Sequence, residues 1–120
     1  MREETIGADR GGMWAWLLQR VTAVLLLLGL AVHIIVTHAL GLGQLSFENV
    51  GIRLGSTVFI VLDLGLLAVG LFHGLNGLRG VLLDYGFSGG SRRAVSVVLG
   101  IIGVTAFAYG TWALWPWLTA

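Results

Sequence analysis

The chain of 120 residues contains no cysteine and no lysine, and it has a single proline. Without cysteine it forms no disulfide, and it supplies neither a thiolate ligand for an iron-sulfur cluster nor a Cys-x-x-Cys-His attachment for haem. Any metal centre held by this chain would therefore depend on histidine, of which there are three.

Charge is scarce as well. Charged residues make up 11% of the chain and hydrophobic residues 57%, which is not the composition of a soluble domain. No charged residue lies between Arg20 and Glu48, and none follows Arg93. We therefore expect an all-α integral membrane protein. The net charge of +1 gives no indication of a nucleic-acid partner.

Three apolar stretches are long enough to cross a hydrocarbon core of about 30 Å, which takes about 20 helical residues. They cover residues 13–40, 56–83 and 94–118. Lipid cannot satisfy unpaired backbone groups, so each stretch is predicted to be a transmembrane helix. The first is too long for a signal peptide and carries two histidines.

The segments outside these stretches are short. They are a polar head, an outer loop and an inner turn, at residues 1–12, 41–55 and 86–93. None of them is long enough to form a catalytic domain. We therefore predict a single integral membrane domain over residues 1–120.

The arginines predict the orientation of the spans. With the N-terminus in the cytoplasm, every arginine except Arg53 falls on the inner side: Arg2, Arg10, Arg20, Arg79, Arg92 and Arg93. This asymmetry is the positive-inside pattern, and tryptophans near both ends of the spans are typical of aromatic belts at the two interfaces. The N-terminus is thus expected inside and the C-terminus outside.

The middle stretch carries the unusual residues. At 100° per residue, Gly77, Gly80 and Asp84 lie within about 40° of the line through His73, with Asp84 about 16 Å nearer the cytoplasmic end. Such a stripe of glycines lets a flat, bulky group or a neighbouring helix approach the backbone closely. In the first stretch His33 likewise shares a face with small residues, Thr22, Gly29 and Thr37, whereas His38 points about 140° away.

These residue types favour redox chemistry in the membrane. A buried neutral imidazole is a good axial ligand for haem iron, and two histidines from different helices would give a six-coordinate, electron-transferring b-type haem. At the inner end Tyr85 can donate a hydrogen bond to a quinone carbonyl. Asp84 can relay protons from the aqueous side to the same site.

Segment 73–85, His-Gly-Leu-Asn-Gly-Leu-Arg-Gly-Val-Leu-Leu-Asp-Tyr, resembles the second-helix motif of the membrane anchor subunits of succinate dehydrogenase and fumarate reductase, respiratory complex II. In those subunits a haem-ligating histidine precedes an Asp-Tyr pair by eleven residues. Segment 19–24, Gln-Arg-Val-Thr-Ala-Val, resembles the start of their first helix. The short head and the Asp-Tyr ending favour the D subunit, while His-x-x-x-Gly-Leu-Arg also matches the C subunit.

The resemblance implies half of a heteromeric membrane helix bundle that binds haem b and ubiquinone or menaquinone. Anchors with two haems use a histidine on each of four helices, so His33 favours two haems over one, shared with the partner subunit. The resemblance implies two haem ligands, His73 and His33. It places three residues near the haem propionates or the quinone: Arg20, Thr22 and Arg79. It also implies that Asp84 and Tyr85 bind the quinone.

The resemblance further implies a non-flavin subunit of succinate dehydrogenase, located in a bacterial cytoplasmic (inner) membrane. Its partners would be a second membrane anchor, an iron-sulfur subunit that delivers electrons, and a flavoprotein that oxidises succinate. No catalytic residue and no complete active site are expected in this chain alone.

Two alternatives remain open. In a haem-free structural anchor or assembly subunit, His33 and His73 would be interhelical packing residues, the role that we also expect for His38. In a small ion or proton transporter, Asp63, Arg79 and Asp84 would line a polar path, although Asp63 and Arg79 lie on different helix faces. Asp63 itself has no predicted role, and its expected partner is His38 or a residue of another chain.

Overall fold

The computed structural model describes residues 2–39, 46–87 and 89–119, and these ranges contain helices and no strand. The elements are α1 (Arg2–Ile34), a π-helical turn η1 (Ile35–Ala39), α2 (Phe47–Leu54), α3 (Thr57–Asp84) and α4 (Gly90–Leu118). Three helical segments are long and apolar enough to span a membrane: Gly12–His38, Thr57–Asp84 and Gly90–Leu118. The predicted all-α class and the three predicted spans are confirmed.

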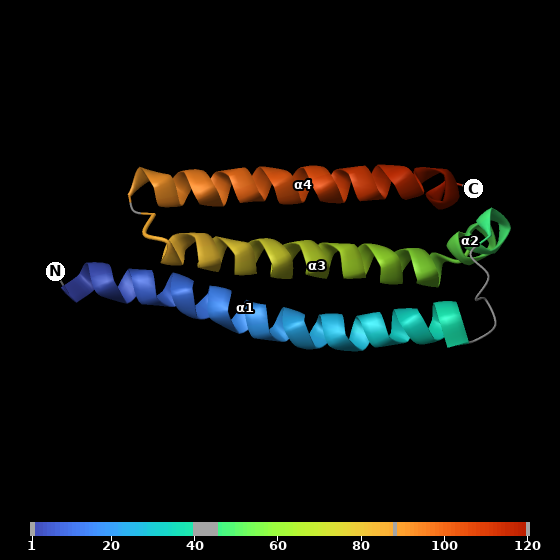
Figure 1. Cartoon of the computed structure of the whole chain (residues 1–120), viewed down its shortest axis with the longest axis horizontal. Coiled ribbons are helices and arrows are strands. Elements are labelled where there is room, and N and C mark those ends of the chain that lie inside the picture. Colours follow the sequence, from blue (N-terminus) through green and yellow to red (C-terminus); the bar gives the residue numbers. More distant parts are fainter. Residues whose placement is uncertain (1, 40–45, 88, 120) are drawn as a thin grey trace.

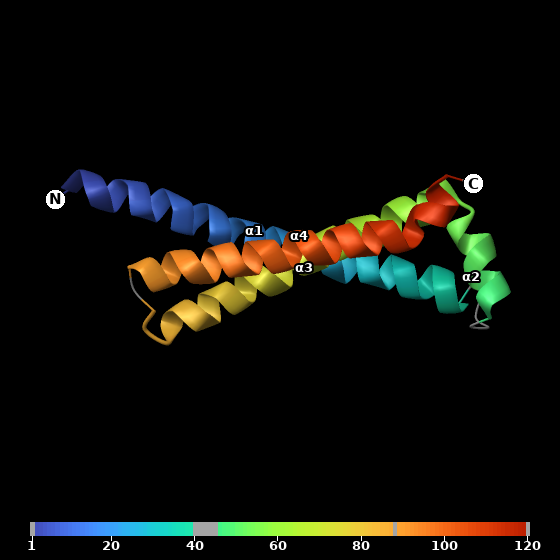
Figure 2. The ribbon, with the colours of Figure 1, turned by 90° about the horizontal axis from the view of Figure 1, so that it is seen from above.

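The three long helices run antiparallel, with α3 in the middle (Figure 1). Among the described residues, α1 and α4 each pack on α3 and not on each other, and the short α2 packs on α3 and α4. Seen from above, α1 crosses the other two helices near their middles (Figure 2). The N-terminus and the α3–α4 turn lie at one end of the bundle and the C-terminus at the other. Which end faces the cytoplasm stays a prediction.

The first helix begins earlier than expected. Residues 2–12, predicted as a polar head, continue α1 without a break. Extending an existing helix avoids the cost of nucleation. The predicted end of this span at Leu40, and residues 41–45 of the outer loop, lie outside the described residues.

The outer loop contains a helix that was not predicted, so the expected loop over 41–55 is wrong for residues 47–54. The Ser46 side chain caps α2 by accepting a hydrogen bond from the Asn49 backbone N–H at 3.1 Å. Glu48 lies in the first turn and Arg53 in the last, as the helix dipole favours. Leu54 is buried, which anchors the end of α2 to the bundle.

The inner turn is shorter than predicted because α4 begins at Gly90 and not at residue 94. Gly86 and Gly89 adopt φ angles of 92° and 58°, in the left-handed region where glycine has no steric penalty. The chain therefore reverses between α3 and α4 within a few residues. Ser88, part of the predicted turn, lies outside the described residues.

Leucines of α3 pack into gaps left by glycines of its two neighbours. A methyl group added at Gly29 would lie 2.8 Å from Leu66, and one at Gly103 would lie 2.8 Å from Leu75. Close approach of backbones at small residues is the usual basis of helix packing in membranes.

Few apolar side chains are buried within the described part of the chain: Leu54, Ile60 and Leu99. Many large apolar side chains are exposed, which suits surfaces that face lipid or other membrane helices.

Candidate functional site

His73 lies near the middle of α3 and faces α1. Its Nδ1 atom is 3.1 Å from the hydroxyl oxygen of Thr22, which is only 8% exposed. The Thr22 hydroxyl donates its proton to the Leu18 carbonyl at 2.7 Å, with the Gln19 carbonyl 3.1 Å away. A hydroxyl has one proton, so towards His73 it acts as an acceptor. The contact therefore favours the tautomer with the proton on Nδ1 and the lone pair on Nε2.

Two amide side chains extend this contact into a network between α1 and α3. Gln19 Nε2 donates to the His73 carbonyl at 3.1 Å and lies 3.5 Å from His73 Nε2. Asn76 Nδ2 donates to Gln19 Oε1 at 2.7 Å and to the Ala15 carbonyl at 3.3 Å. The site reasoning from sequence missed Gln19 and Asn76. The signal available was the spacing of Ala15, Gln19 and Thr22, which places them on one face of α1.

The glycine stripe beside His73 serves helix packing in part. A methyl group at Gly77 would lie 3.1 Å from Gln19 Nε2, and one at Gly70 would lie 3.8 Å from Leu26. Gly74 and Gly80 have no side-chain or non-local neighbour within 4 Å of such a methyl group. Within the stripe, room therefore exists at Gly80 and not at Gly77, and Gly74, about 100° round the helix from His73, is open as well.

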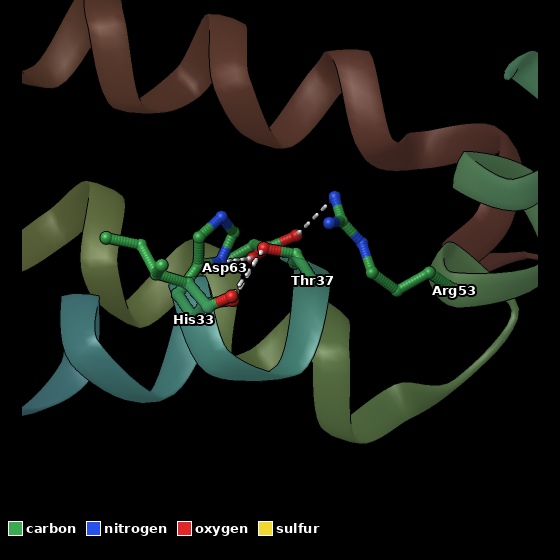
Figure 3. A network of polar contacts seen from close by, with 5 residues as sticks. His33, Thr37, Arg53 and Asp63 are labelled. Carbon is green, nitrogen blue, oxygen red and sulfur yellow. Dashed lines mark hydrogen bonds and ion pairs between the residues drawn. The ribbon is translucent and has the colours of Figure 1, made fainter. Parts of the chain in front are cut away.

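A second polar network occupies the other half of the bundle and joins α1, α2 and α3 (Figure 3). His33 Nδ1 lies 3.1 Å from Asp63 Oδ1, and Asp63 Oδ2 lies 3.8 Å from a terminal nitrogen of Arg53. The Thr37 hydroxyl donates to the His33 carbonyl at 2.7 Å. The expectation that Asp63 pairs with His38 is wrong: its partners within the chain are His33, on the shared α1–α3 interface, and Arg53 of the unpredicted α2. The alternative of a partner on another chain stays a prediction.

The two histidines lie at different depths. Asp63, the partner of His33, precedes His73 by ten residues on α3, which corresponds to about 15 Å along the helix axis. A single metal ion therefore cannot bind both imidazoles. No cluster of three or more potential metal-ligating side chains occurs in the part of the chain that the structure describes. The arrangement provides two separate single-histidine positions.

The two arginines predicted near haem or quinone point in other directions. Arg79 Nε donates to the Ser96 hydroxyl on α4 at 2.7 Å, on the side of α3 away from α1. The Arg20 guanidinium stacks over the Trp16 ring, 4.6 Å from its centroid. Neither arginine is brought to His73, whereas Thr22 is.

Asp84 and Tyr85 stand where α3 ends, in the α3–α4 turn. Both are exposed, Tyr85 to 81%. Their side chains are open to a ligand or a partner subunit at this end of the bundle. His38 is also exposed.

Asp63 faces α1 and α2 while Arg79 faces α4, so the described residues do not line up as the polar path of a transporter.

Comparison with known proteins finds a match over residues 2–118 to the model of the succinate dehydrogenase/fumarate reductase transmembrane subunit family. The succinate dehydrogenase hydrophobic membrane anchor subunit of Archaeoglobus fulgidus is 35% identical over 100 residues, covering 83% of this chain and 86% of the relative.

Two further relatives agree. The succinate dehydrogenase 2 membrane subunit SdhC of Mycobacterium tuberculosis is 30% identical over 77% of this chain and 66% of its own length. The anchor subunit of Thermoplasma acidophilum is 31% identical over 78% of this chain and 76% of its own length. The similarity thus extends through all three membrane spans.

Proposed function

Since the chain belongs to the succinate dehydrogenase/fumarate reductase transmembrane subunit family, we propose that it binds haem b and quinone and passes electrons from an iron-sulfur subunit to quinone. One observation carries the proposal: in an apolar span, the imidazole ring of His73 is held in a fixed orientation by the contact of its Nδ1 atom with the Thr22 hydroxyl. The partners are a second membrane anchor, the iron-sulfur subunit and the flavoprotein that oxidises succinate.

The residues around His73 fit an axial haem ligand. A ligating histidine needs a free ring nitrogen and an acceptor for the N–H of the other nitrogen, and such second-shell acceptors fix the tautomer and raise the basicity of the ligand. Thr22 is that acceptor. The other ring nitrogen, Nε2, lies 3.5 Å from Gln19 Nε2, so the Gln19 amide would have to turn away for a haem iron to bind there. Gly74 and Gly80 leave open space on the same helix. When bound, the haem supplies a one-electron redox centre within the membrane.

His33 fits the same role in the other half of the bundle. Its Nδ1 faces the Asp63 carboxylate at 3.1 Å, an arrangement that holds an imidazole with Nε2 available to a metal. Because His33 and His73 are about 15 Å apart along the helices, each would ligate its own haem, and each haem would take its second ligand from the partner anchor. We therefore favour two haems.

The quinone site of the proposal lies at Asp84 and Tyr85. Reduction of a quinone to a quinol takes up two electrons and two protons, so the site needs both a hydrogen-bond donor and access to water. The exposed Tyr85 hydroxyl can donate to a quinone carbonyl, and the exposed Asp84 carboxylate can accept protons from the aqueous phase and deliver them. Arg20 lies beside Gln19 and Thr22, at the level of His73, and its exposed side chain is available to a haem propionate. The contact of Arg79 with Ser96 does not support that role for Arg79.

The cytoplasmic membrane is the proposed location, with the N-terminus and the α3–α4 turn inside. The arginine asymmetry supports this orientation. The relatives come from archaea and from Mycobacterium, so membership of the family does not by itself indicate a bacterial host.

The first test is the visible spectrum of the purified complex, with haem quantified for His73→Ala, His33→Ala and the control His38→Ala. We expect two b-type haems per copy in the parent, one fewer in each ligand variant, and no loss in the control. A full low-spin haem spectrum in His73→Ala would refute the assignment of that ligand. Absence of haem from the parent complex would favour the haem-free anchor, in which the contacts of His33 and His73 within this chain serve packing alone.

The quinone role is tested by Tyr85→Phe. Loss of the hydroxyl is expected to lower the rate of quinone reduction about tenfold or more. The reason is that a hydrogen bond to a quinone oxygen that becomes negatively charged contributes about 1.5–3 kcal/mol. Succinate oxidation with a soluble artificial acceptor should be unchanged. Equal loss of both activities would show misassembly and contradict a quinone-binding role.

A further inference from the structure

A groove runs between α3 and α4 and shares one residue, Asn76, with the His73 network. It lies between α3, from Ala68 to Arg79, and α4, from Ser96 to Ala108, and encloses about 520 Å³. We call it the α3–α4 groove. Its lining is apolar along its length, and its polar side chains, Asn76, Arg79 and Ser96, gather at the end nearest the α3–α4 turn. The groove therefore has a long apolar part and a short cationic head.

The dimensions of the α3–α4 groove suit one hydrocarbon chain. The segment of α3 from Ala68 to Arg79 extends about 16 Å along the helix axis, and the hydrocarbon of one bilayer leaflet is about 15 Å deep. The volume of about 520 Å³ spread over that length gives a mean cross-section of about 30 Å².

The cationic head favours an anion. Arg79 is half-buried and its Nε donates to Ser96, whose own hydroxyl donates to the Arg92 carbonyl at 3.0 Å. Among the described residues, the ion pairs within 4 Å involve other side chains, so no carboxylate faces Arg79. Near the membrane surface a guanidinium attracts the anionic headgroups of lipids. Its terminal N–H groups present the fork that binds a phosphate through two hydrogen bonds.

We propose that the α3–α4 groove is a binding site for an anionic phospholipid, with one acyl chain along the apolar part and the phosphate on Arg79. Arg79 lies five residues before the end of α3, about 8 Å from it, which is the level of the headgroups in the leaflet that contains the α3–α4 turn. The isoprenoid tail of a quinone matches the apolar part equally well. Its uncharged head, however, offers no compensation for the guanidinium, so a phospholipid is the better match.

Two variants separate the head from the groove. Arg79→Gln removes the charge, while Gly100→Leu fills the groove, because a side chain at Gly100 meets nothing within 4 Å of its Cβ position. Each has a matched control. Arg92→Gln removes an exposed arginine from the same end of α4, and Gly65→Leu adds the same side chain at an equally open position on α3 outside the groove.

The intact complex, stripped of lipid in detergent, is titrated by native mass spectrometry with dioleoylphosphatidylglycerol and, separately, with dioleoylphosphatidylcholine. We expect a saturable phosphatidylglycerol adduct with a preference of about tenfold over phosphatidylcholine. Arg79→Gln should abolish the preference, and Gly100→Leu should weaken both lipids about tenfold. The two controls should behave as the parent. Equal binding of phosphatidylglycerol by all five proteins would overturn the proposal.

Direct occupancy is tested with Gly100→Cys, which gives the only cysteine in this otherwise cysteine-free chain. In native membranes this thiol should react with a phospholipid that bears a maleimide on its acyl chain, and added phosphatidylglycerol should reduce the labelling. An oxidative crosslink from position 100 to another subunit, without lipid labelling, would identify a protein occupant and refute the lipid site. Protection by ubiquinone or menaquinone, but not by phosphatidylglycerol, would assign the groove to the quinone tail.

Discussion

Replacement of Arg53 with Met removes the cation that faces Asp63 inside the bundle. The two charges are 3.8 Å apart, and their side chains are 20% and 19% exposed. At this separation and an effective dielectric constant of about 20, their attraction is about 4 kcal/mol. Loss of one partner of a buried ion pair typically costs about 3–5 kcal/mol, because the other charge is left uncompensated. Partial exposure lowers this figure, and we expect Arg53→Met to destabilise the fold by about 3 kcal/mol.

The more specific part of this prediction is the direction in which Asp63→Asn changes the stability of Arg53→Met. Asp63→Asn keeps an oxygen for the hydrogen bond with His33 but removes the negative charge. In Arg53→Met, the added Asn should therefore restore stability, so that the double variant is more stable than Arg53→Met alone. The hydrogen bond of His33 to position 63 is present in all four proteins of this double-mutant cycle, so the cycle isolates the charge pair.

The assay is unfolding of the purified complex in dodecyl maltoside by increasing mole fractions of dodecyl sulfate, followed by far-UV circular dichroism. Arg92→Met, which removes an exposed arginine at the other end of the bundle, is the control and should change stability by less than about 0.5 kcal/mol. The reasoning is refuted if Arg53→Met matches that control. It is equally refuted if the coupling energy of the cycle is below about 0.5 kcal/mol.

Two further predictions concern α1 and α4. Thr22→Val keeps the shape of the side chain but removes the acceptor for His73 Nδ1. Haem affinity, measured by haem titration of the apo complex, should therefore fall about 10–100-fold. Thr22→Ser keeps the acceptor and should retain the affinity of the parent. If valine binds haem as threonine does, Thr22 does not position the ligand. Gly110→Ala forces a methyl group against Leu67 and should destabilise the α3–α4 pair by about 1–3 kcal/mol, whereas Gly65→Ala, at an open position, should have no such effect in the same unfolding assay.

The spans were predictable because hydropathy and length are local properties. The predicted 56–83 differs from the observed Thr57–Asp84 by one residue at each end. Helix α2 was missed because it has only eight residues with a central Gly51, and the amphipathic spacing of its side chains was not used as a signal. Its stability comes from a cap at Ser46 and from burial of Leu54, and only the second of these depends on the rest of the fold.

The candidate site was predictable only up to helix faces. A helical wheel correctly separates His33 from His38, and Arg79 from His73, because it needs only the residues of one helix. A helical wheel carries no information about the neighbouring helix. It therefore could not predict that Asp63 pairs with His33 and Arg53. Nor could it predict that His73 contacts Thr22 and Gln19. Those pairings depend on the register between antiparallel helices, which is set by packing of leucines on glycines across the bundle.

The central position of α3 explains why the residues of one short motif serve different surfaces. His73 and Arg79 are six residues apart, which turns them about 120° from each other around the helix. A helix packed on one side only would leave one of them without a protein neighbour, but α3 has α1 on one side and α4 on the other. His73 therefore contacts Thr22 of α1, and Arg79 contacts Ser96 of α4. Asn76, midway between them, lines the α3–α4 groove and also donates to Gln19, the neighbour of His73. Two side chains, Asn76 and Gln19, thus connect the groove with the proposed haem ligand. A change in haem midpoint potential on addition of phosphatidylglycerol should therefore disappear in Asn76→Leu.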